Sequence, residues 1–314
     1  MSRLSENYTI NSISSYLKEQ FGSKVIKLSI DGGFTCPNRD GSKGTGGCLF
    51  CSAAGSGDLA SDIPSQIKLL SDKWPNAEHY LAYFQSHTNT YAPVEQLRRQ
   101  YDEALQHPNV HGLVIATRPD CLSEEILDLL AEFNEKTFLW VELGLQTIHE
   151  DTAELINRCY PLSVYDQAIE GLRKRGIKVV THLIFGLPGE TEEQMLESVR
   201  YVCRDLAADD ASENKEPERI FGIKIHMLNL VRGSRMEKLY PDYVSFDSIE
   251  EYVDLVIRAL EIIPPEITIH RMSGDAPRPT LISPEWSYKK RTILNSIHQQ
   301  LRARKTWQGA KLEK

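Results

Sequence analysis

Three cysteines lie close together near the beginning of the chain, at positions 36, 48 and 51, in the stretch CPNRDGSKGTGGCLFC. Eleven residues separate the first two cysteines and two separate the last two. A Cys-x-x-Cys pair on a tight turn can direct two thiolates at one metal centre, and the long loop before it brings a third. Four glycines in that loop allow positive φ angles and close wrapping. The spacing therefore predicts a metal site with three thiolate ligands.

These cysteines could form three kinds of site: a disulfide, a structural zinc site or an iron–sulfur cluster. A disulfide is disfavoured, because the number of cysteines in the loop is odd and nothing in the sequence suggests secretion. A structural zinc site needs four ligands, so a histidine would have to complete it. An iron–sulfur cubane usually takes four thiolates, and three thiolates leave one iron open to an external ligand. Spacing leaves zinc and the open cluster as alternatives, and the motifs further along the chain favour the cluster.

The elements that must position this loop alternate in type along the chain. Helical segments separate six apolar runs that we expect to form strands, at residues 25–30, 79–85, 110–118, 138–146, 177–185 and 219–228. Strands that alternate with helices indicate parallel pairing with the helices outside, which is an α/β fold. We also expect a lead-in helix within residues 1–21, an acidic surface loop at 207–218, an acidic helix at 247–263 and a strand at 267–271.

Polar phrases follow four of these expected strands: YFQSHTNTY, ATRPDC, ELGLQT and FGLPGET. In parallel barrels the functional residues gather at the carboxyl ends of the strands. Each phrase alone is weak, because strand ends are often polar for solvation. Four phrases in register with a cysteine loop after the first strand predict one shared site.

On these residues the chain resembles the radical S-adenosylmethionine (SAM) enzymes. The long spacer between Cys36 and Cys48 is similar to the branch related to the radical SAM subunit of the elongator complex, and Phe50 fits the aromatic residue that usually precedes the last cysteine. The resemblance covers residues 20–290. It implies a partial, six-stranded parallel β/α barrel in residues 1–230, with its lead-in helix, and a small C-terminal α/β extension in residues 231–314.

The resemblance also implies the cofactors. Cys36, Cys48 and Cys51 would bind a [4Fe–4S] cluster whose open iron is chelated by the amino and carboxylate groups of SAM. One electron, from a donor such as flavodoxin or ferredoxin, cleaves SAM to methionine and a 5′-deoxyadenosyl radical that abstracts hydrogen from the substrate. The cofactors supply this chemistry, and the protein positions them and excludes water.

Five residues are implied as SAM-binding positions. Gln85 stands where the family has a glycine-rich phrase that meets the SAM amino group, and Gln146 matches a glutamine at the ribose. Arg158 matches an arginine that pairs with the SAM carboxylate, for which its planar fork is suited. His182 stands where relatives often have an acid, and Gly186 would allow close backbone approach to the adenine. The structural alternatives are a surface ion pair for Arg158, a hydrogen-bonded barrel histidine for His182 and plain turn chemistry for Gly186.

The phrase ATRPDC holds two further candidates. Arg118 could contact substrate or cofactor, or it could form a structural pair with Asp120. Cys121 is the candidate catalytic cysteine, because it follows a strand end that faces the expected site; the ordinary interpretation is a buried, inert thiol. Cys159 and Cys203 lack partner spacing, so we expect no second cluster.

Composition limits the partners. The chain has 314 residues and a net charge of −8, which argues against a broadly basic nucleic-acid surface. From Lys289 to Lys314, however, the chain contains eight basic residues and a single acidic one, Glu313. This tail is either a phosphate-contacting element or a solvated helix face. No apolar run is long enough to cross a membrane, no signal peptide is evident, and six cysteines then indicate a reducing cytoplasm.

The resemblance implies a radical SAM enzyme that modifies tRNA at the C5 side chain of the wobble uridine. Partner tRNA-modifying enzymes could assist, because no separate RNA-binding domain is evident. One alternative is radical SAM chemistry on a small molecule or peptide. Another is a non-catalytic metal-binding scaffold protein, which would bind a metal without cleaving SAM.

Overall fold

The computed structural model describes residues 9–52, 55, 57, 59–71, 73–75, 77–207, 217–274 and 276–312. The expected lead-in helix is present as α2 (Ile13–Phe21), whereas residues 1–8 lie outside the described part. Ser12 caps α2 by accepting a hydrogen bond from the backbone of Ser15, and Gly22 ends it in the left-handed conformation. Most of the expected acidic loop at 207–218 also lies outside the described residues.

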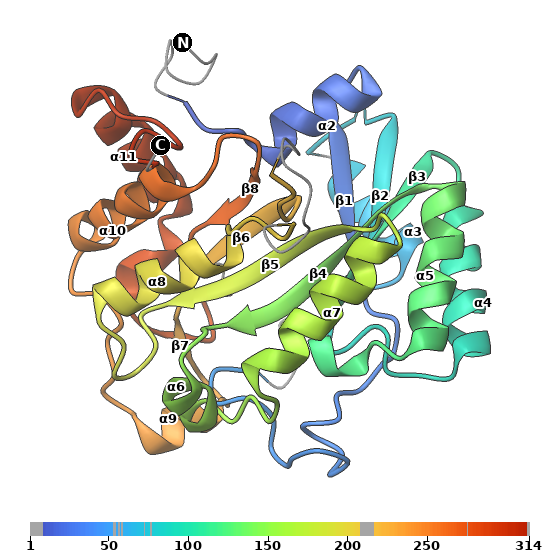
Figure 1. Ribbon diagram of the computed structural model, residues 1–314, viewed down its shortest axis with the longest axis horizontal. Helices are drawn as coiled ribbons and strands as arrows, with labels where there is room; N and C mark the ends of the chain where they lie inside the picture. Colours follow the sequence, from blue (N-terminus) through green and yellow to red (C-terminus); the bar gives the residue numbers. More distant parts are fainter. Residues whose placement is uncertain are drawn as a thin grey trace.

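Seven parallel strands form one curved sheet, with the order β1-β2-β3-β4-β5-β6-β8 (Figure 1). They are β1 (Val25–Ile30), β2 (His79–Phe84), β3 (Val110–Thr117), β4 (Phe138–Gln146), β5 (Lys178–Phe185), β6 (Gly222–Met227) and β8 (Thr268–Met272). The predicted partial parallel barrel is confirmed, with one strand more than the six expected. The additional strand is β8, which is expected in the C-terminal extension and pairs in parallel with β6 of the barrel. The division into 1–230 and 231–314 stays a prediction.

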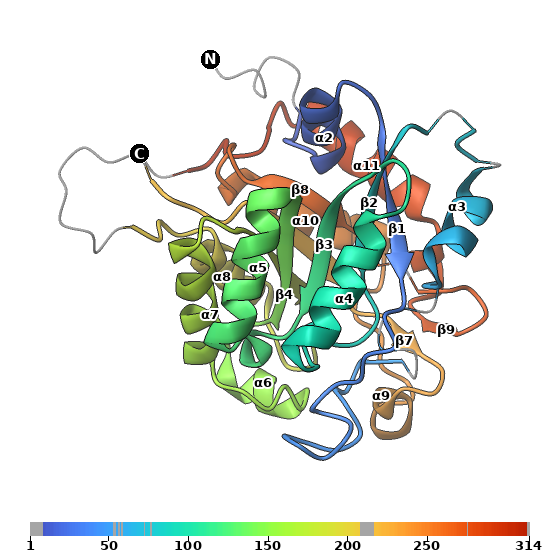
Figure 2. The same ribbon diagram turned by 90° about the vertical axis from the view of Figure 1, so that its right-hand side faces the viewer.

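Helices cover the convex outer face of the sheet (Figure 2). They are α3 (Ile63–Ser71), α4 (Val94–Leu105), α5 (Glu124–Lys136), α7 (Leu162–Lys174), α8 (Glu192–Val202) and α10 (Ile249–Ile262). Their apolar stripes pack on outward-facing strand residues such as Leu28, Ile115 and Val141 to form the main core. The predicted capping box is present at the beginning of α8, between Thr191 and Gln194.

The C-terminal helix α11 (Lys290–Ala303) packs against α10. Ile293, Ile297 and Leu301 recur at four-residue spacing and are fully buried, so one face of α11 belongs to the main core. The shorter elements are α6 (Glu150–Leu155), α9 (Arg235–Leu239), the 3₁₀ turns Pro119–Cys121 and Glu285–Tyr288, and the antiparallel pair β7 (Leu230–Val231) and β9 (Leu281–Ser283).

The concave face of the sheet is closed at one end only. Side chains alternate between the two faces of each strand, so Leu81, Val114 and Trp140 point into the barrel near the amino ends of their strands. Ile13 and Leu17 of α2 pack against this second apolar cluster and plug the barrel there. The interior therefore opens at the carboxyl ends of the strands. Among the described residues, no helix is both long and apolar enough to cross a membrane.

Candidate active site

A cavity of about 470 Å³ opens at the carboxyl ends of the strands. All three cysteines of the predicted metal site, Cys36, Cys48 and Cys51, line it together with Phe50. The opposite wall comes from the interior of the barrel. The strand-end phrases YFQSHTNTY, ATRPDC and ELGLQT each contribute residues to the same cavity, whereas no residue of FGLPGET lines it.

The cysteine loop is held by its own backbone and by the segment after α6. The amide of Gly47 donates to the carbonyl of Asn38 at 2.8 Å, and that of Leu49 donates to the carbonyl of Ile156 at 2.9 Å. Gly41, Gly46 and Gly47 have positive φ angles of 91°, 77° and 77°, which side chains rarely adopt. The glycines thus permit the tight path that brings the cysteines to the cavity.

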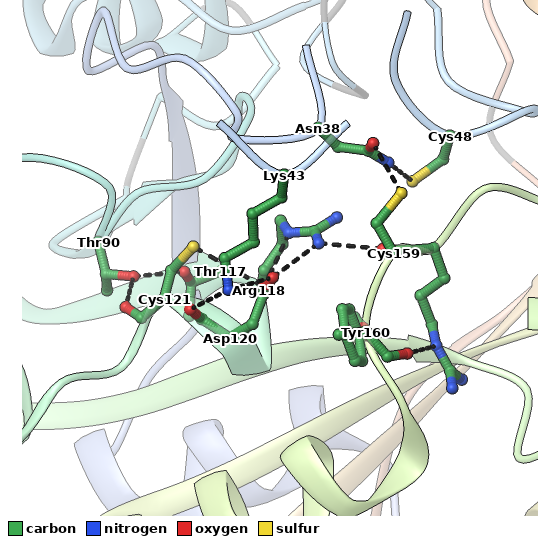
Figure 3. Close-up of polar contacts among 12 residues, drawn as sticks. Asn38, Lys43, Cys48, Thr90, Thr117, Arg118, Asp120, Cys121, Cys159 and Tyr160 are labelled. Atoms are coloured by element: carbon green, nitrogen blue, oxygen red, sulfur yellow. Dashed lines mark hydrogen bonds and ion pairs between the residues drawn. The ribbon is translucent and has the colours of Figure 1, made fainter. Parts of the chain in front are cut away.

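The side chain of Asn38 connects Cys48 to the segment that contains Asn157 and Cys159 (Figure 3). Its amide nitrogen lies 3.5 Å from the sulfur of Cys48 and 2.5 Å from the carbonyl of Asn157, and its amide oxygen accepts from the thiol of Cys159 at 3.2 Å. Burial raises the pKa of Cys48 to about 12, with repulsion from Cys51 as the next cause and the charge of Arg118 opposing it. A positively charged metal centre would be needed to hold this sulfur as a thiolate.

The arrangement of the three thiols can be compared with the predicted cluster. Within the described ranges, no group of three or more His, Cys, Asp or Glu side chains is placed to hold one metal ion. The three sulfurs line one cavity instead, and three thiolates at the edge of a cavity suit a cubane with one iron open. The donor set and the room beside it agree with the cofactors that the sequence predicts.

The predicted SAM-binding residues divide into two groups. Gln85, Gln146 and His182 line the cavity, whereas Arg158 and Gly186 are not among its lining residues. Gln146 has φ of 69°, an uncommon backbone conformation for a residue with a side chain. A Cβ on Gly144 would come within 2.6 Å of the Gln146 side-chain nitrogen, so a larger residue there would displace the end of the Gln146 side chain.

Arg158 lies behind the cavity wall and is 1% exposed. Its guanidinium donates to the carbonyls of Tyr160, Leu145 and Thr147 at 3.0, 3.3 and 2.6 Å. It also pairs with Glu150 at 3.1 Å. These contacts tie the end of β4 to α6, and the alternative of a surface ion pair does not describe them. A role at the SAM carboxylate stays a prediction.

Arg118 lines the cavity and forms the expected pair with Asp120 (Figure 3). Both contacts, Nε to Oδ1 and Nη2 to Oδ2, are 2.9 Å long. Lys43 of the cysteine loop reaches the same carboxylate at 3.1 Å. Burial opposes ionisation, but the hydrogen bonds and charge of Arg118 hold the pKa of Asp120 below its usual value. The pair therefore fastens the cysteine loop to the end of β3.

Cys121 and Gly186 occupy packed positions. Burial raises the pKa of Cys121 to about 12, so it is a neutral thiol at pH 7, and it does not line the cavity. Its catalytic role stays a prediction. Gly186 has φ of 84°, and a Cβ there would meet Ser245 at 2.7 Å and Phe246 at 2.8 Å. Tight packing beneath that segment accounts for the glycine, and contact with adenine stays a prediction.

Sequence reasoning missed a layer of ionisable residues inside the barrel. The carboxylate of Glu142 on β4 contacts Lys224 of β6 and lies 3.0 Å from Nε2 of His182 on β5. Its second oxygen accepts from the indole of Trp140 at 3.1 Å, and Lys224 donates to the hydroxyl of Tyr83 at 3.0 Å. The sequence carries a signal for this layer, because ionisable residues interrupt the apolar runs of these strands, as in VELGL and GIKIH.

Burial controls the charges of this layer. It alone would raise the pKa of Glu142, but the charge of Lys224 and the hydrogen bond from His182 hold that pKa well below the usual value. Burial lowers the pKa of Lys224 to about 7 against the attraction of Glu142. Burial, together with the charge of Lys224, lowers the pKa of His182 to about 4. Glu142 is therefore ionised and His182 neutral at pH 7.

Two protein-family patterns together match most of the chain. The sequence pattern of the radical SAM superfamily matches residues 39–202, and that of a radical SAM C-terminal domain matches residues 220–303. The uncharacterized protein YtqA of Bacillus subtilis is 46% identical over 308 residues, which is 95% of this chain and 91% of that protein.

Elongator proteins are more distant relatives. Elongator complex protein 3 of Drosophila melanogaster is 28% identical over 176 residues, which is 55% of this chain and 29% of that protein. The structure of the archaeal Methanocaldococcus infernus Elp3 superimposes with a TM-score of 0.64 at 17% identity, over 88% of this chain and 63% of that one, which shows a shared fold.

The chain belongs to the radical SAM superfamily, and the predicted relation to the elongator subunit is confirmed. The superfamily's cofactors, a [4Fe–4S] cluster and SAM, are those predicted from the cysteine loop.

Proposed function

We propose that this radical SAM enzyme modifies tRNA at the C5 side chain of the wobble uridine. One observation supports the chemistry above all others: Cys36, Cys48 and Cys51 line a single cavity with the polar interior of the barrel. The relation to elongator complex protein 3 supports the tRNA substrate. A reducing cytoplasm suits such a centre, and all six cysteines are free thiols.

We assign a role to each residue of the cavity from its position. Cys36, Cys48 and Cys51 would hold the cluster, and Gln85 and Gln146 lie where they can orient SAM in the same cavity. When bound, the cluster and SAM supply reductive cleavage and hydrogen abstraction. The apolar cluster plugged by α2 keeps water from entering through the far end of the barrel.

The basic residues of α11 would contact tRNA phosphates. Six of them are exposed on and beside the helix: Lys289, Lys290, Arg291, Arg302, Arg304 and Lys305. The positive charge of Lys290 acts on Lys27 inside the barrel, so the beginning of α11 lies close to the interior. Arg304 pairs with Asp254 at 2.6 Å across exposed side chains, a contact that phosphate could replace at little cost.

The substrate is tested by comparing tRNA nucleosides from wild-type and deletion strains by mass spectrometry. We expect a change confined to the wobble uridine. An unchanged nucleoside profile in a strain that normally expresses the protein would refute the tRNA assignment while leaving the radical SAM class intact.

Binding is tested with the triple variant Arg302→Glu, Arg304→Glu and Lys305→Glu. The matched control reverses three exposed basic residues on α2, α3 and α4: Lys18, Lys68 and Arg99. We expect only the α11 variant to bind tRNA more weakly and with a flatter salt dependence, because fewer counterions are released. Equal salt slopes for the two variants would show that α11 is a solvated helix face.

A further inference from the structure

The strands place several ionisable side chains in one layer of the barrel, beneath the cysteine loop. Their register makes His182, Lys224 and Arg271 direct neighbours across β5, β6 and β8. Glu142 contributes from β4 and Lys27 from β1. The side chains of direct neighbours in a parallel sheet lie on the same face, so these residues surround one space.

The carboxylate of this layer, that of Glu142, already has hydrogen-bond and charge partners. Glu142 is completely buried, and its two oxygens accept from Trp140 and interact with Lys224 and His182. Lys224 is 2% exposed and is the cation that neutralises it. Glu142 and Lys224 therefore form a closed pair beside the cavity.

Several cations line the cavity. Of the described residues that line it, Lys27, Arg39, Arg118 and Arg271 are basic, and Glu142 is the single Asp or Glu. Arg39 and Arg118 come from the region of the cysteines, whose thiolates supply negative charge there. Lys27 and Arg271 come from the two edge strands of the sheet. Burial lowers the pKa of Lys27, the charge of Glu142 opposes this, and the charges of Arg271 and Lys290 add to the lowering. Partly buried cations in such surroundings are stabilised by an anion that binds among them.

A neutral donor points into the same space. His226 follows Lys224 by two residues on β6, so it lies on the same face one step closer to the cavity mouth, and it lines the cavity. Its Nε2 is buried, and no hydrogen-bond partner is found for it among the described residues. Burial holds the pKa of His226 well below its usual value, so the ring is neutral. A ligand oxygen would satisfy this atom.

We propose that Lys27, His226 and Arg271 form an oxyanion-binding subsite at the floor of the cavity, which takes a carboxylate or phosphate of the substrate. This inference rests on the proposed function insofar as that substrate reacts in this cavity. Lys27 contributes a point charge, and Arg271 has five N–H donors, enough to bind the oxyanion besides its other contacts. Lys27 lies in the middle of β1, whereas His226 and Arg271 each stand one residue before the end of their strands. Competition with SAM therefore tests whether the subsite is separate from the SAM site.

The test uses the full-length, anaerobically reconstituted protein without reductant and two probes, inorganic phosphate and acetate, at constant ionic strength. Acetamide is the uncharged control. Binding is measured by calorimetry and by tryptophan fluorescence, because the ammonium of Lys27 lies 5.7 Å from the ring centre of Trp140. We expect saturable binding of at least one anion and none of acetamide. Phosphate alone would identify a phosphate subsite, and acetate alone a carboxylate subsite.

Two substitutions locate the bound anion. Lys27→Met and Arg271→Met should each weaken it roughly tenfold or more, because each removes a charge-assisted contact. Lys18→Met, an exposed residue of α2, should leave the affinity unchanged. Lys27→Met keeps the length of the side chain and replaces a charge that burial disfavours with an apolar group, so it should fold. The melting temperature of the wild type should rise with the anion, and that of Lys27→Met should not.

Three results would overturn the inference: no saturable binding of either anion to the wild type, undiminished binding to both variants, or displacement of the anion by SAM. The last would assign these residues to the SAM carboxylate. None of these results depends on tRNA, so the subsite and the proposed substrate can fail separately. An altered nucleoside profile without anion binding would refute the subsite alone, and the reverse would refute the tRNA assignment alone.

Discussion

Glu142→Gln tests whether the buried charge pair stabilises the barrel. The glutamine retains an oxygen for the indole of Trp140, but its charge no longer faces Lys224, and its amide group cannot accept as the carboxylate does from both Lys224 and His182. Removing one partner of a buried ion pair costs about 3–5 kcal/mol of unfolding free energy. Lys224 has a pKa of about 7 and can lose its proton, so we expect the lower end, about 3 kcal/mol.

The matched variant removes both charges. In Glu142→Gln/Lys224→Met no unpaired ammonium remains, so the double variant should be more stable than the sum of the single variants predicts, by roughly 0.5–3 kcal/mol. The assay is urea unfolding of cluster-free protein under reducing conditions at pH 7.5, followed by circular dichroism and by tryptophan fluorescence to check two-state behaviour. Strict additivity of the two single substitutions would refute the reasoning, because it would mean that the pair contributes no coupling.

Three further predictions concern the cysteines, His182 and Arg158. Alanine at any of the three loop cysteines should prevent the binding of about four irons per chain, measured by iron analysis, whereas Cys203→Ala should retain them; iron retained without the loop cysteines would contradict the ligand assignment. The pKa of His182 is lowered from 6.5 to about 4, so the unfolded chain binds more protons and stability should fall as pH decreases from about 6.5 to 4, by up to about 3 kcal/mol. His182→Asn should make urea-unfolding stability less dependent on pH in that window, and an unchanged slope would contradict the shift. Arg158→Met should lower the free energy of unfolding by about 2 kcal/mol or more, because buried carbonyls lose their hydrogen-bond donor. Unchanged SAM affinity in the folded variant would contradict the role implied by the resemblance.

The part of the fold that sequence predicts is the part that local patterns encode. Apolar runs, helix caps and turn glycines are properties of a few adjacent residues, so the first six strands and the capping box at Thr191 could be located. The cysteine spacing is a local pattern of the same kind, and it predicts the metal site. The seventh strand was recognised as a strand, but its place beside β6 depends on a partner about 45 residues away.

The features that sequence reasoning could not supply depend on contacts across the barrel. The phrase INR predicts a SAM-carboxylate role for Arg158, with a surface ion pair as the alternative. In the structure the chain turns after α6 with a positive φ at Asn157, and the guanidinium donates to carbonyls of β4. Glu142 and Lys224 are 82 residues apart, and each alone resembles an isolated charge in a strand. Only the register of the whole sheet brings them together.

One irregularity in that register decides which cation meets the cavity. Along β6 and β8, Ile223 pairs with Ile269, but the next pair is Lys224 with Arg271, so β8 contains one additional residue. Without it, Lys224 would face His270, whose ring instead packs edge-on against Trp140 at 5.4 Å in the deeper part of the barrel. Such a bulge re-aims side chains beside active sites. A shift of one residue normally exchanges the two faces of a strand. The bulge therefore lets the consecutive residues His270 and Arg271 both serve the barrel interior, His270 through its contact with Trp140 and Arg271 at the cavity.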